Sequence, residues 1–162
     1  MILVTVGTQL PFDRLIRIVD ALAAETDEPF VAQIGDGSYR PAHMEWHRFI
    51  EPVRFDRLLA DTRLIISHAG IGTVLNARKT GKPVILFPRR AELGEHRNDH
   101  QMATIGSLEG RRGVYVAQDA AEIAAYLKQD LARPEGDAVL AAHQDLLDRV
   151  AGHIRLLGQR GR

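Results

Sequence analysis

Two glycine-containing turns, each between a short apolar run and a helical stretch, carry the residues best suited to chemistry. The more informative turn is 68–73, which reads H-A-G-I-G-T and lies between the apolar run 64–66 and a helical stretch ending at Thr80. At such a turn, free backbone N–H groups and the helix dipole favour an anion. Two glycines allow a phosphate to approach the backbone closely, and His68 and Thr73 add polar atoms. The turn therefore favours a diphosphate site, with a simple tight turn as the alternative, because G-x-G alone is weak evidence.

A second turn of the same kind follows the first apolar run of the chain. Residues 2–6 read I-L-V-T-V, Gly7 and Thr8 follow, and a helical pattern begins at Asp13. In doubly wound folds the loop after the first strand commonly faces the ligand. Gly7 and Thr8 are therefore candidates for the same site, and the alternative is that Gly7 only makes the turn.

A third candidate is the polar segment 89–100. Asp99, His100 and the following Gln101 stand before a helical pattern, where such side chains can hydrogen-bond several hydroxyls of a sugar. His96 and His100 are also four residues apart, which raises the alternative of a zinc site, but the segment does not match H-E-x-x-H. We expect no metal here. A solvated loop that caps the next helix is the other alternative.

A parallel sheet would bring these three segments together. Short apolar runs alternate with helical patterns, which is typical of an α/β, Rossmann-like fold with a parallel sheet of about six strands flanked by helices. In such sheets the ligand lies at the carboxyl ends of the strands. We expect strands at 2–6, 30–34, 47–51, 64–66, 84–87 and 112–116, and helices at 13–24, 55–60, 73–80, 103–108 and 120–131.

The length of 162 residues fits one domain, 1–162, with its core at about 1–132. A long C-terminal helix is expected at about 138–158. It carries one continuous apolar stripe, which needs cover from this domain or from a partner.

Composition excludes several classes of protein. Lysine plus arginine equals aspartate plus glutamate, at 21 each, so the charge does not suggest a nucleic-acid partner. The absence of cysteine rules out disulfides and thiolate metal sites. No apolar run approaches the roughly 18 residues of a membrane span, and the N-terminus lacks the features of a signal peptide. We therefore expect a cytoplasmic protein whose membrane association is peripheral. The sequence also lacks the Walker A, nucleophile-elbow and dinucleotide-binding patterns.

Several segments together resemble the C-terminal, donor-binding domain of family 28 glycosyltransferases, which is one half of a GT-B fold. These segments are His68-Ala-Gly-Ile-Gly-Thr73, Gly81-Lys-Pro-Val-Ile85, Pro88-Arg89 and Glu95-His-x-x-x-His-Gln101. The start, Val4-Thr-Val-Gly-Thr-Gln-Leu-Pro-Phe-Asp-Arg-Leu15, is similar to exopolysaccharide proteins of the PssE type. Those proteins resemble the small cytosolic subunit of the eukaryotic dolichol-diphosphate N-acetylglucosaminyltransferase. The resemblance covers roughly residues 1–130.

The resemblance implies a domain that binds a UDP-sugar, with no further cofactor. The residues that would hold the diphosphate are His68, Ala69, Gly70, Gly72 and Thr73. Gln101, with Asp99 and His100, would face the donor sugar, while Gly7 and Thr8 would line the cleft. Asn76 stands where related transferases carry a ribose-binding glutamate, so the charged contact to the ribose is absent here.

The resemblance further implies an inverting, metal-independent transferase that uses a hexosyl or glucuronosyl donor. The implied partner is a membrane-anchored, acceptor-binding subunit, which holds a polyprenyl-diphosphate-linked glycan and keeps this chain at the inner face of the plasma membrane. Within this chain His68 is the candidate general base, but we expect it to serve the diphosphate and the base to come from the partner.

Two rival functions stay open. A regulatory subunit would enhance a partner transferase without binding nucleotide sugar, and it would need neither the glycine turn nor the Asp99–Gln101 cluster. A two-domain nucleotide-sugar epimerase would need more chain than is present.

Overall fold

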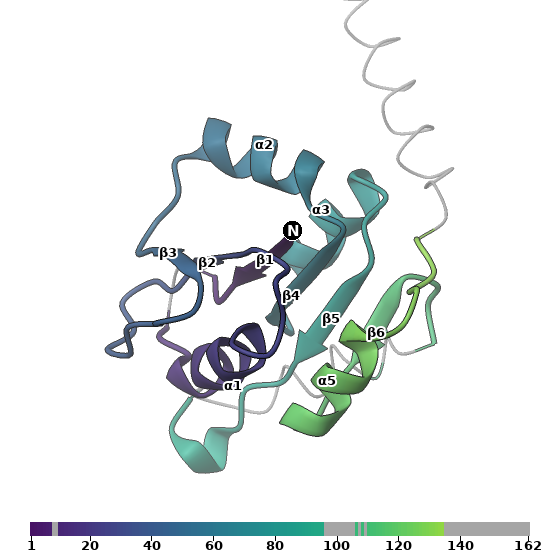
Figure 1. Ribbon diagram of the computed structural model, residues 1–162. Helices are drawn as coiled ribbons and strands as arrows, with labels where there is room; N and C mark the ends of the chain where they lie inside the picture. The colour runs from purple at the N-terminus through teal and green to yellow at the C-terminus, as the bar shows by residue number, and fades with distance from the viewer. Residues whose placement is uncertain (8–9, 96–105, 107, 109, 135–162) are drawn as a thin grey trace, which may run out of the picture.

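The computed structural model describes residues 1–7, 10–95, 106, 108 and 110–134. Within these residues, six parallel strands form one sheet in the order β3-β2-β1-β4-β5-β6 (Figure 1). The strands are β1 (Ile2–Thr5), β2 (Phe30–Gln33), β3 (Glu45–His47), β4 (Leu64–His68), β5 (Val84–Phe87) and β6 (Val114–Val116). The helices are α1 (Asp13–Ala23), α2 (Pro52–Asp61), α3 (Ile71–Lys79), the 3₁₀ helix η1 (Ala91–Leu93) and α5 (Ala120–Leu127).

The strand order is that of the Rossmann fold and confirms the predicted fold class. The chain runs outward from β1 to β3, returns to the centre at β4, and then runs outward to β6 on the other side. The loops after β1 and β4 therefore leave the sheet side by side in opposite directions, which makes the switch point where ligands bind in such folds. The expected helix at 138–158 lies outside the described residues.

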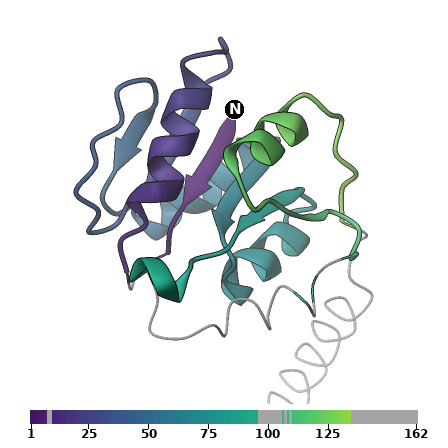
Figure 2. The ribbon, with the colours of Figure 1, turned by 90° about the horizontal axis from the view of Figure 1, so that it is seen from below.

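The two faces of the sheet bury separate apolar clusters because side chains alternate along each strand. Ile2 and Val4 of β1 pack with α1 and α5, whereas Leu3 packs with α2 and α3. The views in Figures 1 and 2 show the same division, with α1 and α5 on one side and α2 and α3 on the other. The strands are thus covered on both sides, as expected for a parallel sheet.

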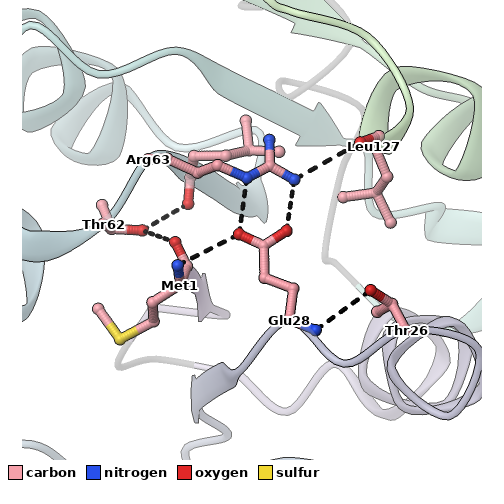
Figure 3. Close-up of polar contacts among 7 residues, drawn as sticks. Met1, Thr26, Glu28, Thr62, Arg63 and Leu127 are labelled. Atoms are coloured by element: carbon pink, nitrogen blue, oxygen red, sulfur yellow. Dashed lines mark hydrogen bonds and ion pairs between the residues drawn. The ribbon is translucent and has the colours of Figure 1, made fainter.

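An ion-pair cluster joins several elements at the amino ends of the strands (Figure 3). Arg63, just before β4, donates two hydrogen bonds to the carboxylate of Glu28, and its Nε lies 2.6 Å from Oε1. The Met1 amino group lies 3.2 Å from the same carboxylate, and Arg63 also reaches the carbonyl of Leu127 at the end of α5. This cluster fixes the edge of the sheet opposite the carboxyl ends.

Several predicted boundaries were wrong. The third strand covers Glu45–His47 instead of 47–51, and the chain turns at Ile50, whose N–H binds Gln33. Helix α2 starts at Pro52, three residues early, because proline is well suited to a first helical turn. The last described helix ends at Leu127 rather than at residue 131, although Leu131 is still buried.

The loop after β2 is held by a buried carboxylate on α1. Asp20 is 1% exposed and accepts hydrogen bonds from the Tyr39 hydroxyl at 2.7 Å and from the N–H groups of Ala42 and His43. Burial raises the pKa of Asp20, but these hydrogen bonds outweigh it, and the net pKa is lowered. The ionised form is therefore the one that stabilises the fold.

Replacing Asp20→Asn should lower the free energy of unfolding by about 1 to 3 kcal/mol at pH 7, the range for losing charge-assisted hydrogen bonds. A lowered folded-state pKa contributes stability above the unfolded value of about 3.9, and that contribution disappears as the pH falls below it. Urea denaturation between pH 7 and pH 3 measures this. The difference between wild type and variant should shrink at acid pH, and a constant difference would contradict a role for the charge.

Candidate functional site

A cleft of about 720 Å³ opens at the carboxyl ends of β1, β2 and β4. Its walls come from the ends of these strands, the first turns of α2 and α3, and Arg89 after β5. The volume lies within the range of roughly 300 to 1,000 Å³ found for small-molecule sites. The cleft therefore stands at the switch point, where the sequence predicted the ligand.

The structure brings most of the described site candidates together. The predicted residues that line the cleft are Gly7, His68, Gly70, Gly72, Thr73 and Asn76. Ala69 does not line it but is 3% exposed and packs in the core beside α3. Thr8, Asp99, His100 and Gln101 lie outside the described residues, so their assignments stay predictions.

The His68 ring lies between the two glycine turns. A Cβ added at Gly7 would lie 2.7 Å from His68 Cε1, and one added at Gly70 would overlap His68 Nε2. Gly7 also has a φ of +77°, which side-chain-bearing residues rarely adopt. A side chain at either glycine would therefore force the His68 ring to move, and the ring joins the loop after β1 to the loop after β4.

The Ser67 hydroxyl connects His68 to Thr73. Ser67 is fully buried, and its Oγ lies 3.2 Å from His68 Nδ1 and 3.2 Å from Thr73 Oγ1, to which it donates. The Ser67 hydroxyl therefore holds the imidazole ring through Nδ1, and the tautomer of the ring decides which of its two nitrogens donates.

The first turn of α3 lines the cleft, and the N–H groups of a first helical turn have no partner within the helix. No side chain caps this helix, its first turn has no acidic residue, and its last turn carries Arg78 and Lys79. This charge distribution leaves the positive end of the helix dipole available to an anion. A Cβ added at Gly72 would meet nothing within 4 Å, so the space beside Gly72 is open.

Arg89 and Gln33 line the cleft but were not among the predicted site residues. Arg89 is 4% exposed, and burial lowers its pKa to about 10, partly offset by Glu95. Gln33 is 7% exposed, and its Oε1 accepts the N–H of Ile50 at 2.9 Å. A glutamine within the apolar run 30–34 was the available signal for Gln33. For Arg89, the signal was the Pro88-Arg89 pair after a buried strand.

Within the described residues, no group of three or more histidine, aspartate or glutamate side chains is arranged to hold a metal ion. The Glu95 carboxylate instead accepts two hydrogen bonds from Arg14 at 2.7 Å each. None of the helices in the described part of the chain is long and apolar enough to cross a membrane.

Alanine at Gly70 and alanine at Gly72, both in the turn 68–73, should have opposite effects on the stability of the fold. Gly70→Ala forces the His68 ring to move and should lower the free energy of unfolding by about 1 to 3 kcal/mol. Gly72→Ala adds a methyl group in open space within a helix and should be neutral or stabilising by up to about 1 kcal/mol. Chemical denaturation of both variants checks this. Equal losses would contradict the packing of the ring.

Comparison with known proteins finds one matching family model and several solved structures with a similar fold. Residues 1–135 match the family model of the glycosyltransferase family 28 C-terminal domain. Among solved structures, the glycotransferase of kitacinnamycin is 20% identical with a TM-score of 0.59, over 76% of this chain and 32% of that one. The calicheamicin glycosyltransferase CalG4 is 20% identical with a TM-score of 0.58, over 99% and 43% of the two chains. No curated protein sequence matches significantly.

The chain thus spans about a third of the kitacinnamycin enzyme and less than half of CalG4. The solution structure of ALG13 is 17% identical with a TM-score of 0.57, and the match covers 90% of this chain and 94% of that one. At these identities the structures establish the fold, a half of the GT-B architecture, while the family model establishes the family. This chain belongs to the family of the glycosyltransferase family 28 C-terminal domain.

Proposed function

We propose that this chain is the donor-binding, catalytic subunit of a two-component glycosyltransferase. It would take a hexosyl or glucuronosyl group from a UDP-sugar and act, with inversion and without a metal, on a polyprenyl-diphosphate-linked glycan in exopolysaccharide or capsule synthesis. The observation that carries the proposal is the open first turn of α3, which faces a cleft of about 720 Å³.

The diphosphate fits best beside Gly72. There the backbone N–H groups of the first turn of α3 are close to the cleft, and no side chain occupies the space. His68 contributes a ring nitrogen, and Thr73 contributes a hydroxyl already oriented by Ser67. These groups supply donors and a positive dipole end to a ligand with two or three negative charges.

The uridine would extend from the diphosphate along the same cleft. Asn76 is one turn after Gly72 on α3, so both lie on the helix face that lines the cleft. Its amide can hydrogen-bond a ribose hydroxyl. Gln33, Ile50 and Phe55 line the part of the cleft formed by β2 and α2, where a polar edge and apolar surface suit a planar base.

For the chemistry, the acceptor hydroxyl attacks the anomeric carbon of the donor while the bond to the UDP oxygen breaks. Negative charge grows on the diphosphate as UDP leaves, and fixed N–H groups with the α3 dipole would stabilise that charge. The acceptor hydroxyl must lose a proton. The ring of His68 is held by Ser67 and would serve the diphosphate, so we assign the base to the partner.

The partner would be a membrane-anchored protein that supplies the acceptor-binding half and keeps this chain at the inner face of the membrane. The comparisons that support this arrangement are those in which the matched fold makes up only 32% and 43% of two solved transferases but 94% of the ALG13 chain, so the same fold occurs both as part of a longer chain and nearly alone.

Calorimetric titration with UDP and UDP-sugars tests the donor site. Gly72→Asp places a carboxylate in the open space where the phosphate would lie, so UDP affinity should fall at least tenfold. Because an acidic residue near a helix N-terminus is favourable, the fold itself should not suffer.

Ala121→Asp is the matched control, since Ala121 is also the second residue of a helix, is exposed, and does not line the cleft. Its UDP affinity should equal that of wild type. Equal affinity of wild type and Gly72→Asp would contradict the proposed site. If wild type binds no nucleotide even with its partner co-expressed, the result would favour the alternative function, a regulatory subunit that does not bind nucleotide sugar.

A further inference from the structure

Arg89 is the most extensively bound side chain at the cleft. Its Nη2 donates to the carbonyls of Val6 at 2.9 Å and Leu10 at 2.7 Å, and its Nη1 donates to the carbonyl of Pro11 at 2.5 Å. These carbonyls belong to the loop between β1 and α1, 78 to 83 residues away in the sequence. The guanidinium also lies 4.6 Å from the centre of the Phe12 ring.

The other described hydrogen bonds of this loop are longer. The N–H of Gly7 lies 3.4 Å from Thr5 Oγ1, and the N–H of Val6 lies 3.3 Å from the carbonyl of Gln33. Bonds from a charged donor at 2.5 to 2.9 Å are roughly twice as strong as neutral ones. Among the described hydrogen bonds of this loop, the shortest are therefore those from Arg89, two residues after β5.

That position matters because Gly7 must lie against the His68 ring. Arg89 binds the carbonyl of Val6, the residue just before Gly7, so a shift of the loop would move Gly7 directly. Nη1 of Arg89 also donates to the carbonyl of Glu95 at 3.2 Å, which ties the segment after β5 to the same group. The Arg89 side chain thus connects the loop after β1 with the segment after β5.

We propose that Arg89 is a positioning residue for the anion-binding cleft: it holds the loop after β1 so that Gly7 packs against His68 beside the first turn of α3. The anion as ligand rests on the proposed function, whereas the positioning role concerns the free protein. A lysine cannot take over, because its single ammonium lacks the planar fork that reaches carbonyls on several sides.

Arg89→Lys tests this, with Arg14→Lys as the control. Arg14 is a neighbour that donates to the carbonyl of Pro88 and to Glu95, and it stacks 4.5 Å from the centre of the Phe87 ring, but it does not line the cleft. Each variant loses an arginine fork that binds the segment after β5, the Arg89 fork being buried and the Arg14 side chain 24% exposed, so both should lose stability. This comparison separates positioning from general destabilisation.

The first readout is the NMR signals of the Gly7 amide and the His68 ring in free protein. Arg89→Lys should shift both, and Arg14→Lys should leave both unchanged. The second readout is calorimetry with UDP, in which Arg89→Lys should bind at least tenfold more weakly and Arg14→Lys within about threefold of wild type.

Unchanged Gly7 and His68 signals in Arg89→Lys would overturn the proposal, as would equal shifts in both variants. If wild type fails to bind UDP, the proposed function falls, while the NMR comparison still decides the role of Arg89.

Should Arg89→Lys not fold, Arg89→Ala with added methylguanidinium replaces it. Recovery of the wild-type Gly7 and His68 signals would then support positioning, and a folded protein without recovery would contradict it.

Discussion

The contact of one imidazole with two glycines determines how the site is built. His68 ends the central strand β4, and its ring occupies the space that a side chain at Gly7 or Gly70 would need. The contact is available because β1 and β4 are neighbours in the sheet, with Thr5 paired to Ser67. The strand order, the left-handed conformation of Gly7 and the burial of Arg89 all serve the same arrangement, in which two loops meet over one ring.

The first turn of α3 is capped differently from the first turn of α5. In α5, Asp119 caps the helix by accepting the N–H of Glu122 at 2.9 Å, which is typically worth about 1 kcal/mol. Helix α3 has no such side-chain cap. Helices α1 and α2 also lack one, so an absent cap alone indicates little, and α2 begins with Pro52, which has no N–H to offer. The uncapped first turns of α2 and α3 both line the cleft, and α3 differs in carrying Gly72, beside which the space is open.

Much of the fold was predictable because it depends on local patterns. The strand Val84–Phe87 and the start of a helix at Ala120 were placed correctly, since a buried apolar run and a capping aspartate such as Asp119 act over a few residues. The glycine turn at 68–73 was also recognised, although α3 starts at Ile71 and includes Gly72 instead of starting at Thr73.

The remaining parts depend on contacts between distant segments. Arg89 binds residues more than 75 positions away, and Gln33 fixes the turn at Ile50, so neither role has a local signature. The family resemblance grouped Ala69 with the phosphate-binding residues, and the structure shows that its side chain packs in the core. A motif identifies a segment, whereas the fold decides which of its side chains line the cleft.

We propose that the first turn of α3, beside His68, binds the diphosphate of a nucleotide. A titration of isotope-labelled protein with UDP, followed through the backbone amide signals, tests this. We expect the largest shifts at Gly70, Gly72 and Thr73, together with Gly7 across the cleft, and we expect inorganic diphosphate to move the same signals. Shifts confined to residues away from this turn, or saturable UDP binding that leaves these four amides unchanged, would contradict it.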